Sequence, residues 1–153
     1  MKKLILSSML AFAAMMTAQS QAATTANIAV PVQVTLTPLC VLTAPSTIAI
    51  AYTSFAASNN ASQNGAVKCT NSRPYKLSWD STTDTVTTTP SAITSSVGIS
   101  YTLSITAGAT GTGDGNDAAF TVRATTTGNE AGTCATGGSC VGTVQNTTLY
   151  VHY

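Results

Sequence analysis

Hydrophobic side chains along this chain recur at every second position, and no segment shows the 3.6-residue spacing of a convincing helix. The clearest run lies near the N-terminus, at Ile28, Val30, Val32, Val34 and Leu36. Successive side chains of a strand point to opposite faces, so one face of this segment would be entirely aliphatic. The pattern predicts an extended strand with a single apolar face.

The same period continues through the rest of the chain. Further strands are predicted at residues 47–53, 66–70, 75–80, 97–106, 118–125 and 142–153. Turn-forming residues separate them, at 44–46, 59–60, 64–65, 72–74, 89–91, 111–116, 128–129 and 137–138. About seven short strands with frequent turns predict an all-β chain, arranged as a β-sandwich of the immunoglobulin type.

The composition supports this fold class and narrows the partners. The chain is 44% hydrophobic and only 7% charged, against about 25% charged in an average globular domain. Proteins that bind nucleic acids need Lys and Arg to neutralise phosphates, so we expect no nucleic-acid partner. Disordered chains combine high net charge with low hydrophobicity, and this chain has neither.

The first 22 residues predict a secretory signal peptide. Lys2 and Lys3 are followed by a short apolar run over residues 4–16, and Ser20-Gln21-Ala22 places small residues at a cleavage site. A transmembrane helix needs about 20 apolar residues, and no later segment is that long, so no transmembrane segment is expected. The exported chain would begin at Ala23 and carry almost no net charge.

The four cysteines all follow the predicted leader. An even number of cysteines on an oxidising export route predicts two disulfides. Four cysteines allow three pairings, and we favour Cys40–Cys69 and Cys134–Cys140 because each pair is nearest in sequence. A zinc site needs paired C-x2-C spacings. The sequence contains none, so no metal site is predicted.

The last predicted strand carries Leu149, Val151 and Tyr153 on one side, and no turn or further strand follows it in the sequence. A strand without a neighbour exposes unpaired backbone groups, which stable monomers usually cover or protect with charge. We expect this strand to leave one edge open to a strand from another molecule.

Several motifs, taken in order, resemble the pilins of the chaperone–usher class. They are Val67-Lys68-Cys69-Thr70, Pro74-Tyr75-Lys76-Leu77, Ile99-Ser100-Tyr101-Thr102-Leu103 and the terminal Leu149-Tyr150-Val151-His152-Tyr153. The chain looks most like the archaic branch, the spore coat protein U-like pilins. The Cys134–Cys140 loop departs from the family pattern. The penultimate residue departs as well, because the classical branch has Tyr where this chain has His152.

The resemblance implies an incomplete immunoglobulin-like sandwich that lacks its final strand. It assigns residues 1–22 to the signal peptide, 23–36 to a donor-strand extension and 37–153 to the pilin domain. A periplasmic chaperone would first fill the groove beside Leu149, Val151 and Tyr153. At an outer-membrane usher, the extension of the next subunit would then replace the chaperone, with Ile28, Val30, Val32 and Val34 as donor side chains. The implied product is a head-to-tail polymer of pilin subunits, a cell-surface pilus that supports adhesion or biofilm formation.

Pro31 leaves the register of the donor strand open. Proline cannot donate a ladder hydrogen bond, and a donor strand is paired on both sides. Either a bulge lies at Pro31, or the donor ends near Val30 and residues 32–39 form the first strand of the domain.

The remaining candidate chemistry favours no enzyme and no cofactor. His152 is the only histidine, and no nucleophile motif accompanies it, so we expect an outward-facing strand residue. Tyr75 and Trp79 fit a sandwich core, but they also allow the alternative of a secreted carbohydrate-binding or adhesin domain. The loop 111–117 weakly resembles a calcium-binding repeat, yet a single copy is more typical of a hairpin loop.

Overall fold

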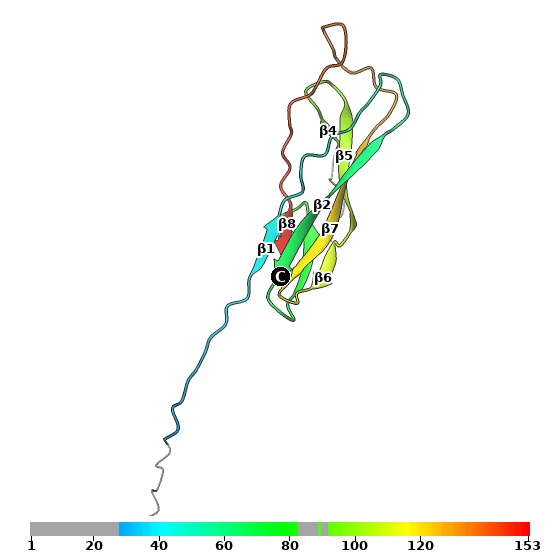
Figure 1. The fold of residues 1–153 in the computed structure, drawn as a ribbon. Coiled ribbons are helices and arrows are strands. Elements are labelled where there is room, and N and C mark those ends of the chain that lie inside the picture. The colour runs from blue at the N-terminus through cyan, green and yellow to red at the C-terminus, as the bar shows by residue number, and fades with distance from the viewer. Residues whose placement is uncertain (1–27, 83–88, 90–91) are drawn as a thin grey trace, which may run out of the picture. The chain divides into compact units, whose positions relative to one another are not determined.

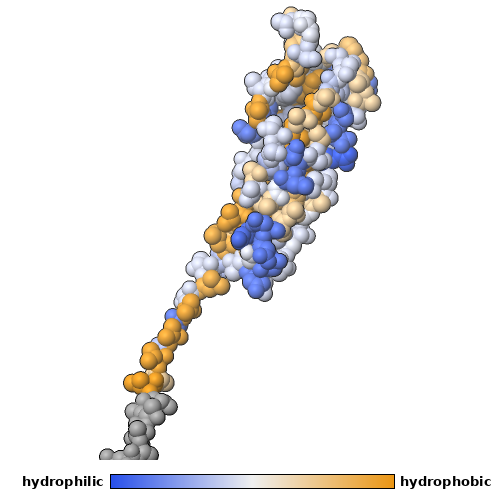
Figure 2. All heavy atoms as spheres, in the orientation of Figure 1, coloured by the Kyte–Doolittle hydropathy of each residue, from blue (hydrophilic) through white to orange (hydrophobic). Residues whose placement is uncertain are grey.

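The computed structural model of the chain describes residues 28–82, 89 and 92–153. The predicted signal peptide and residues 23–27 lie outside the described residues. The chain divides into an N-terminal unit that ends at Thr35 and a second unit, Leu36–Tyr153, which we call the body. Residues 28–35 form no strand, and the side chains of Ile28, Val30, Val32 and Val34 are 74–87% exposed. Figure 2 shows residues 28–36 as a nearly continuous run of hydrophobic atoms.

The described part of the body contains strands and loops and no helix. The strands are β1 (Cys40–Thr43), β2 (Asn60–Cys69), β3 (Pro74–Ser78), β4 (Ile93–Thr94), β5 (Ser100–Ala107), β6 (Thr110–Thr112), β7 (Asp117–Thr126) and β8 (Tyr150–His152). They form a five-stranded sheet in the order β1-β2-β7-β5-β4 and a three-stranded sheet in the order β6-β3-β8 (Figure 1). Every pairing is antiparallel. The all-β prediction is confirmed.

Both sheets contribute side chains to one hydrophobic core. The five-stranded sheet supplies Val67 and Phe120, and the three-stranded sheet supplies Tyr75 and Leu77. All four are at most 5% exposed, although Tyr75 carries a polar hydroxyl. This arrangement is β-sandwich-like, with two layers that bury one face each.

The two disulfides join the pairs that are nearest in sequence. Cys40 and Cys69 face each other across β1 and β2, with a Cα–Cα distance of 4.1 Å, and both are buried in the core. Cys134 and Cys140 close a short loop that is mostly exposed. The described residues contain no free cysteine.

The prediction was wrong at residues 59–65, where two turns were expected. β2 instead runs through them from Asn60, paired with β7. The outward-facing Asn60 and Asn64 accept hydrogen bonds from Arg123 and Thr121 of β7, at 3.1 and 2.8 Å. Cross-strand polar pairs of this kind stabilise a sheet face that meets water, which explains a strand without an apolar period.

Two predicted strands are absent or shortened among the described residues. Residues 47–53 form no strand, and the predicted strand at 142–153 is reduced to β8. Even so, burial alternates in the first of them: Ile48 and Ile50 are half-buried against the core, while Ala49 and Ala51 are exposed. The side chains of residues 48–51 therefore follow the period of a strand. The segment is not a strand because no described neighbour pairs with its backbone.

Candidate functional site: an open apolar groove

A groove of about 1080 Å³ opens along the body. Its floor consists of core residues from the five-stranded sheet, namely Leu103, Phe120, Val122 and Ala124. Trp79 and Tyr101 also line it. Figure 2 shows hydrophobic atoms between paler ones in the upper part of the body. None of the described lining residues carries a charge, so the groove is suited to an apolar occupant.

The first wall of the groove is residues 42–53, which continue from β1. Ile48 and Ile50 pack toward the core from this wall. Residues 44–52 make no backbone–backbone hydrogen bond to any described residue. One side chain, Asn59, donates from Nδ2 to the carbonyl of Ala51 at 2.7 Å. This wall therefore presents a row of unpaired peptide groups.

The second wall is residues 139–147 and Leu149, which lead into β8. In Figure 1 this segment, orange to red, and the first wall, cyan to teal, run along the same side of the body. Its described backbone contact to the rest of the body is the Thr143 N–H, which donates to Ser96 Oγ at 2.7 Å. β8 then pairs with β3, with Val151 opposite Leu77. Within the described chain, β8 has no neighbour on its other edge.

Residues 44–52 and 139–149 thus make no backbone–backbone hydrogen bond to any described residue, while an apolar floor lies between the two walls. Buried N–H and C=O groups are almost always paired in native proteins, and an exposed strand edge is a template for a further strand. The chemistry of the site is recognition of an extended peptide: main-chain hydrogen bonds on both sides and alternate side chains directed at the floor.

The structure places the residues predicted at the last strand in different surroundings. Leu149 is half-buried and lines the groove. Val151 is half-buried against the core, and Tyr153 is 46% exposed. Neither Val151 nor Tyr153 is among the described groove-lining residues. The predicted donor side chains lie in the N-terminal unit and form no strand there.

Sequence reasoning missed the first wall and the floor as parts of one site. Residues 47–53, 97–106 and 118–125 were each predicted as an ordinary strand, without a groove between them. The sequence carries no local signal for the groove, because periodicity shows which face of a segment is buried and not which segment lies beside it. Only the fold reveals that residues 47–53 face residues 139–149.

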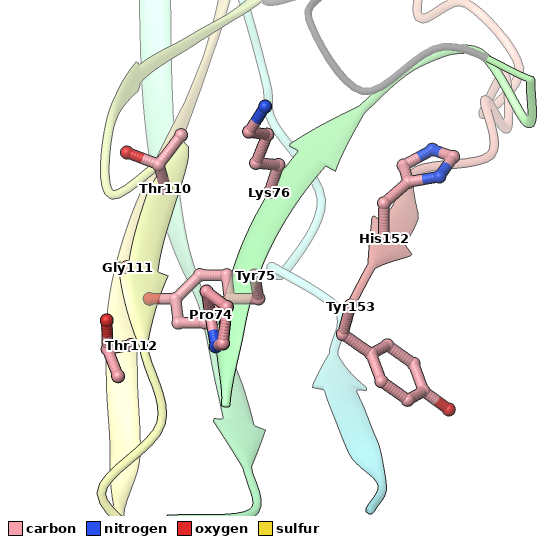
Figure 3. Close-up of a pocket in the computed structure, with 8 residues that line it drawn as sticks. All are labelled: Pro74, Tyr75, Lys76, Thr110, Gly111, Thr112, His152 and Tyr153. Carbon is pink, nitrogen blue, oxygen red and sulfur yellow. The ribbon is translucent and has the colours of Figure 1, made fainter. Parts of the chain in front are cut away.

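A second hollow, of about 600 Å³, lies beside β3, β6 and β8 and is lined by Lys76, Gly111 and His152 among others. Figure 3 shows that the side chains of Lys76 and His152 point along the sheet, while the ring of Tyr153 swings away from Tyr75. His152 is half-buried, with Nε2 3.0 Å from the carbonyl oxygen of Asp80. The side chains do not converge on one point, as a catalytic constellation would require.

The pKa values of Tyr75, Tyr101 and Asp114 are shifted from their ordinary values. Burial raises the pKa of Tyr75, and the negative charge of Asp114 raises it further. Burial alone raises the pKa of Tyr101, which lines the groove. The hydrogen bond from the Asn116 backbone lowers the pKa of the exposed Asp114 carboxyl. Only Tyr101 belongs to the groove, and its neutral form suits the uncharged lining.

Other kinds of site find little support in the described residues. Within 28–82, 89 and 92–153, no group of three or more His, Cys, Asp or Glu side chains is placed to hold a metal ion. The same residues include no helix with the length and apolar character needed to span a membrane. Searches against protein-family models, curated proteins and solved structures found no match to this chain.

Proposed function

We propose that this chain is a non-enzymatic structural subunit of a pilus, and that it polymerises by accepting a strand from another molecule. The observation that carries the proposal is the groove, with an uncharged, largely apolar lining and unpaired backbone on both walls. In this interpretation the body is an immunoglobulin-like sandwich without its final strand. The missing strand would lie between residues 44–52 and 141–149.

The N-terminal segment has the pattern that such a groove requires. Ile28, Val30, Val32, Val34 and Leu36 alternate with other residues and are each at least 74% exposed. Burying an aliphatic side chain of this size contributes about 1.5–3 kcal/mol. Five of them would contribute roughly 8–15 kcal/mol before the costs of ordering and association are subtracted. Because association alone costs about 4–15 kcal/mol, the main-chain hydrogen bonds along the groove would have to add to this burial.

The arrangement of donor and acceptor within one chain determines the kind of assembly. The donor segment and the groove are different surfaces, so each contact is head-to-tail, and such contacts make open filaments when the rotation does not close a ring. Before assembly the exposed groove needs protection, which is the role we assign to a periplasmic chaperone, with an outer-membrane usher as the site of exchange. The two disulfides are typical of that oxidising route.

The alternative of a carbohydrate-binding domain is not favoured by the structure. It would use Tyr75 and Trp79 as an exposed aromatic platform. Tyr75 is buried in the core, and Trp79 is half-buried against it.

A pair of neighbouring substitutions tests the proposal. Val30→Asp places a charge on the apolar face of the segment, whereas Ala29→Asp places the same charge on the opposite face. We expect the wild type and the Ala29→Asp variant to form SDS-resistant polymers on gels of unheated samples, and the Val30→Asp variant to stay monomeric. If all three polymerise equally, or if the wild type is a stable monomer whose groove is closed by its own segment, the proposed function is wrong.

A further inference from the structure

The Cys134–Cys140 loop directly precedes the second wall of the groove. Ser139 and Cys140 belong to the groove lining themselves, followed by Val141. In Figure 1 the loop is the orange-brown hairpin at the top of the body. The loop is therefore continuous with the wall that a donor strand would have to meet.

Both ends of the loop are attached to the same turn of the body. On one side, the Thr133 N–H donates to the carbonyl of Val97 at 2.7 Å. On the other side, the Thr143 N–H donates to Ser96 Oγ, also at 2.7 Å. The turn 95–98 is itself closed by a hydrogen bond from Gly98 N–H to the Ser95 carbonyl at 2.9 Å. The start of the second wall is thus held by hydrogen bonds to one turn, whereas its other end continues into β8, which pairs with β3.

The backbone of residues 134–142, between these attachments, makes no hydrogen bond to the rest of the described body. Residues 134–139 are exposed, and a Cβ on Gly137 or Gly138 would meet nothing within 4 Å. A glycine-containing segment of this kind has many accessible conformations. The disulfide removes most of them, so it keeps the Thr143 attachment close to the Thr133 attachment.

We propose that the Cys134–Cys140 disulfide is a positioning element of the groove, which holds the second wall where an incoming strand can pair with it. This proposal rests on the function proposed above. Strand acceptance then depends on this bond, whereas the fold of the body depends on Cys40–Cys69 and the core. The Cys134–Cys140 loop and its two hydrogen-bonded attachments would thus fix the position of the second wall, which an exposed strand edge without such a loop would lack.

Because the two disulfides differ in exposure, one can be reduced while the other stays intact. Cys40 and Cys69 are 8% and 2% exposed, whereas Cys134 is exposed. A dithiol reductant such as dithiothreitol reaches the exposed bond first. One of its thiolates attacks a protein sulfur, which breaks the Cys134–Cys140 S–S bond, releases one cysteine thiolate and forms a mixed disulfide. Its second thiolate then attacks the reductant sulfur of that mixed disulfide and releases the other cysteine. The protein gains two electrons and two protons as two thiols, and the reductant becomes a cyclic disulfide.

The test measures binding of a fluorescent synthetic peptide of residues 28–36 to the full chain carrying Val30→Asp, which keeps the chain's own segment from competing. In that background we compare the intact disulfide with the Cys134→Ser/Cys140→Ser pair and with selective reduction verified by mass spectrometry. We expect at least tenfold weaker peptide binding in both altered forms, restored by reoxidation in the reduced form. Near-ultraviolet circular dichroism of the aromatic core should be unchanged.

A milder variant keeps the proposal testable if the cysteine pair folds poorly. Ser96→Ala removes the acceptor for the Thr143 N–H and leaves the disulfide in place, and it should also weaken peptide binding. Ser62→Ala, an exposed serine on β2, is the matched control and should bind like the parent. If the parent binds the peptide and all variants bind within twofold of it, the positioning role is refuted. If the parent itself does not bind, the proposed function is refuted, and the positioning role with it.

Discussion

The close approach of β2 to the ring of Phe120 leaves no room for a side chain at Gly65. Gly65 lies opposite Phe120 in the β2–β7 register. A Cβ at this position would lie 2.4 Å from Cζ of Phe120 and 2.7 Å from the carbonyl oxygen of Thr43. Phe120 is 1% exposed and belongs to the core, and the carbonyl belongs to the paired strand β1. A Cβ at Gly65 would therefore require a shift of the Phe120 ring or of β1.

Glycine within a strand normally costs about 0.5–1 kcal/mol relative to alanine, so a Gly→Ala change usually stabilises. At Gly65 the clash should reverse the sign, because inserting one methyl group into a well-packed core costs about 1–3 kcal/mol. With a backbone oxygen in the way, we expect a net loss of about 2 kcal/mol for Gly65→Ala. This would lower the urea midpoint by roughly 1 M, for a slope near 2 kcal/mol per molar urea.

Equilibrium urea unfolding, at a concentration where the chain is monomeric, measures this loss. Gly137→Ala is the matched control, because a Cβ there meets nothing within 4 Å, and it should be neutral or slightly stabilising. In a Phe120→Leu background the ring atoms are gone, so Gly65→Ala should cost at least about 1 kcal/mol less than in the wild type. A neutral Gly65→Ala variant, or a loss that Phe120→Leu leaves unchanged, would refute the packing argument.

Three further predictions concern stability. Removing the Cys40–Cys69 bond with a pair of serines should destabilise the body by about 3–4 kcal/mol, because the bond closes a loop of sequence separation 29; chemical denaturation under non-reducing conditions measures it, and a loss below about 1 kcal/mol contradicts it. Phe55 has a φ of 62° and is 72% exposed, so Phe55→Asn should stabilise by about 0.5–1 kcal/mol through relief of left-handed strain, and a lower urea midpoint would oppose this. The raised pKa of Tyr75 means that the folded state keeps its phenolic proton to higher pH than the unfolded chain. Its contribution to stability is therefore complete below about pH 10 and declines as pH rises through the raised pKa; Tyr75→Phe should flatten this alkaline decline in unfolding measured up to about pH 11, and an unaltered slope would exclude Tyr75 as a cause.

Much of the sheet structure was predictable because apolar alternation coincides with core-facing positions. Leu103 and Ile105 of β5, and Phe120 and Val122 of β7, are inward residues of strands that the period alone predicts. The all-β class follows from the same signal. The strand predicted at residues 47–53 does not form, although the burial of its side chains still alternates.

The parts that could not be predicted depend on partners that local sequence does not specify. The first half of β2 is polar, and its strand state comes from pairing with β7 and from hydrogen bonds such as Thr121 to Asn64. Conversely, residues 142–149 have strand-like composition but no neighbour to pair with among the described residues. The groove exists because segments with strand-like composition lie beside it without a neighbouring strand to pair with. Periodicity reports which face is buried, and only the fold shows which edges stay open.

The Cys40–Cys69 bond has a mechanical consequence. Any tension applied through the N-terminal segment enters the body at Leu36 and reaches Cys40, the first residue of β1. From there the disulfide carries the load covalently into Cys69 at the end of β2, which is paired with β7 along most of its length. The four-residue β1 is thereby spared the peeling force that would otherwise unzip its few hydrogen bonds one at a time. In a fibre built from such subunits, the load would pass from the pulled segment to β2 through the disulfide, and it would not depend on the hydrogen bonds between β1 and β2.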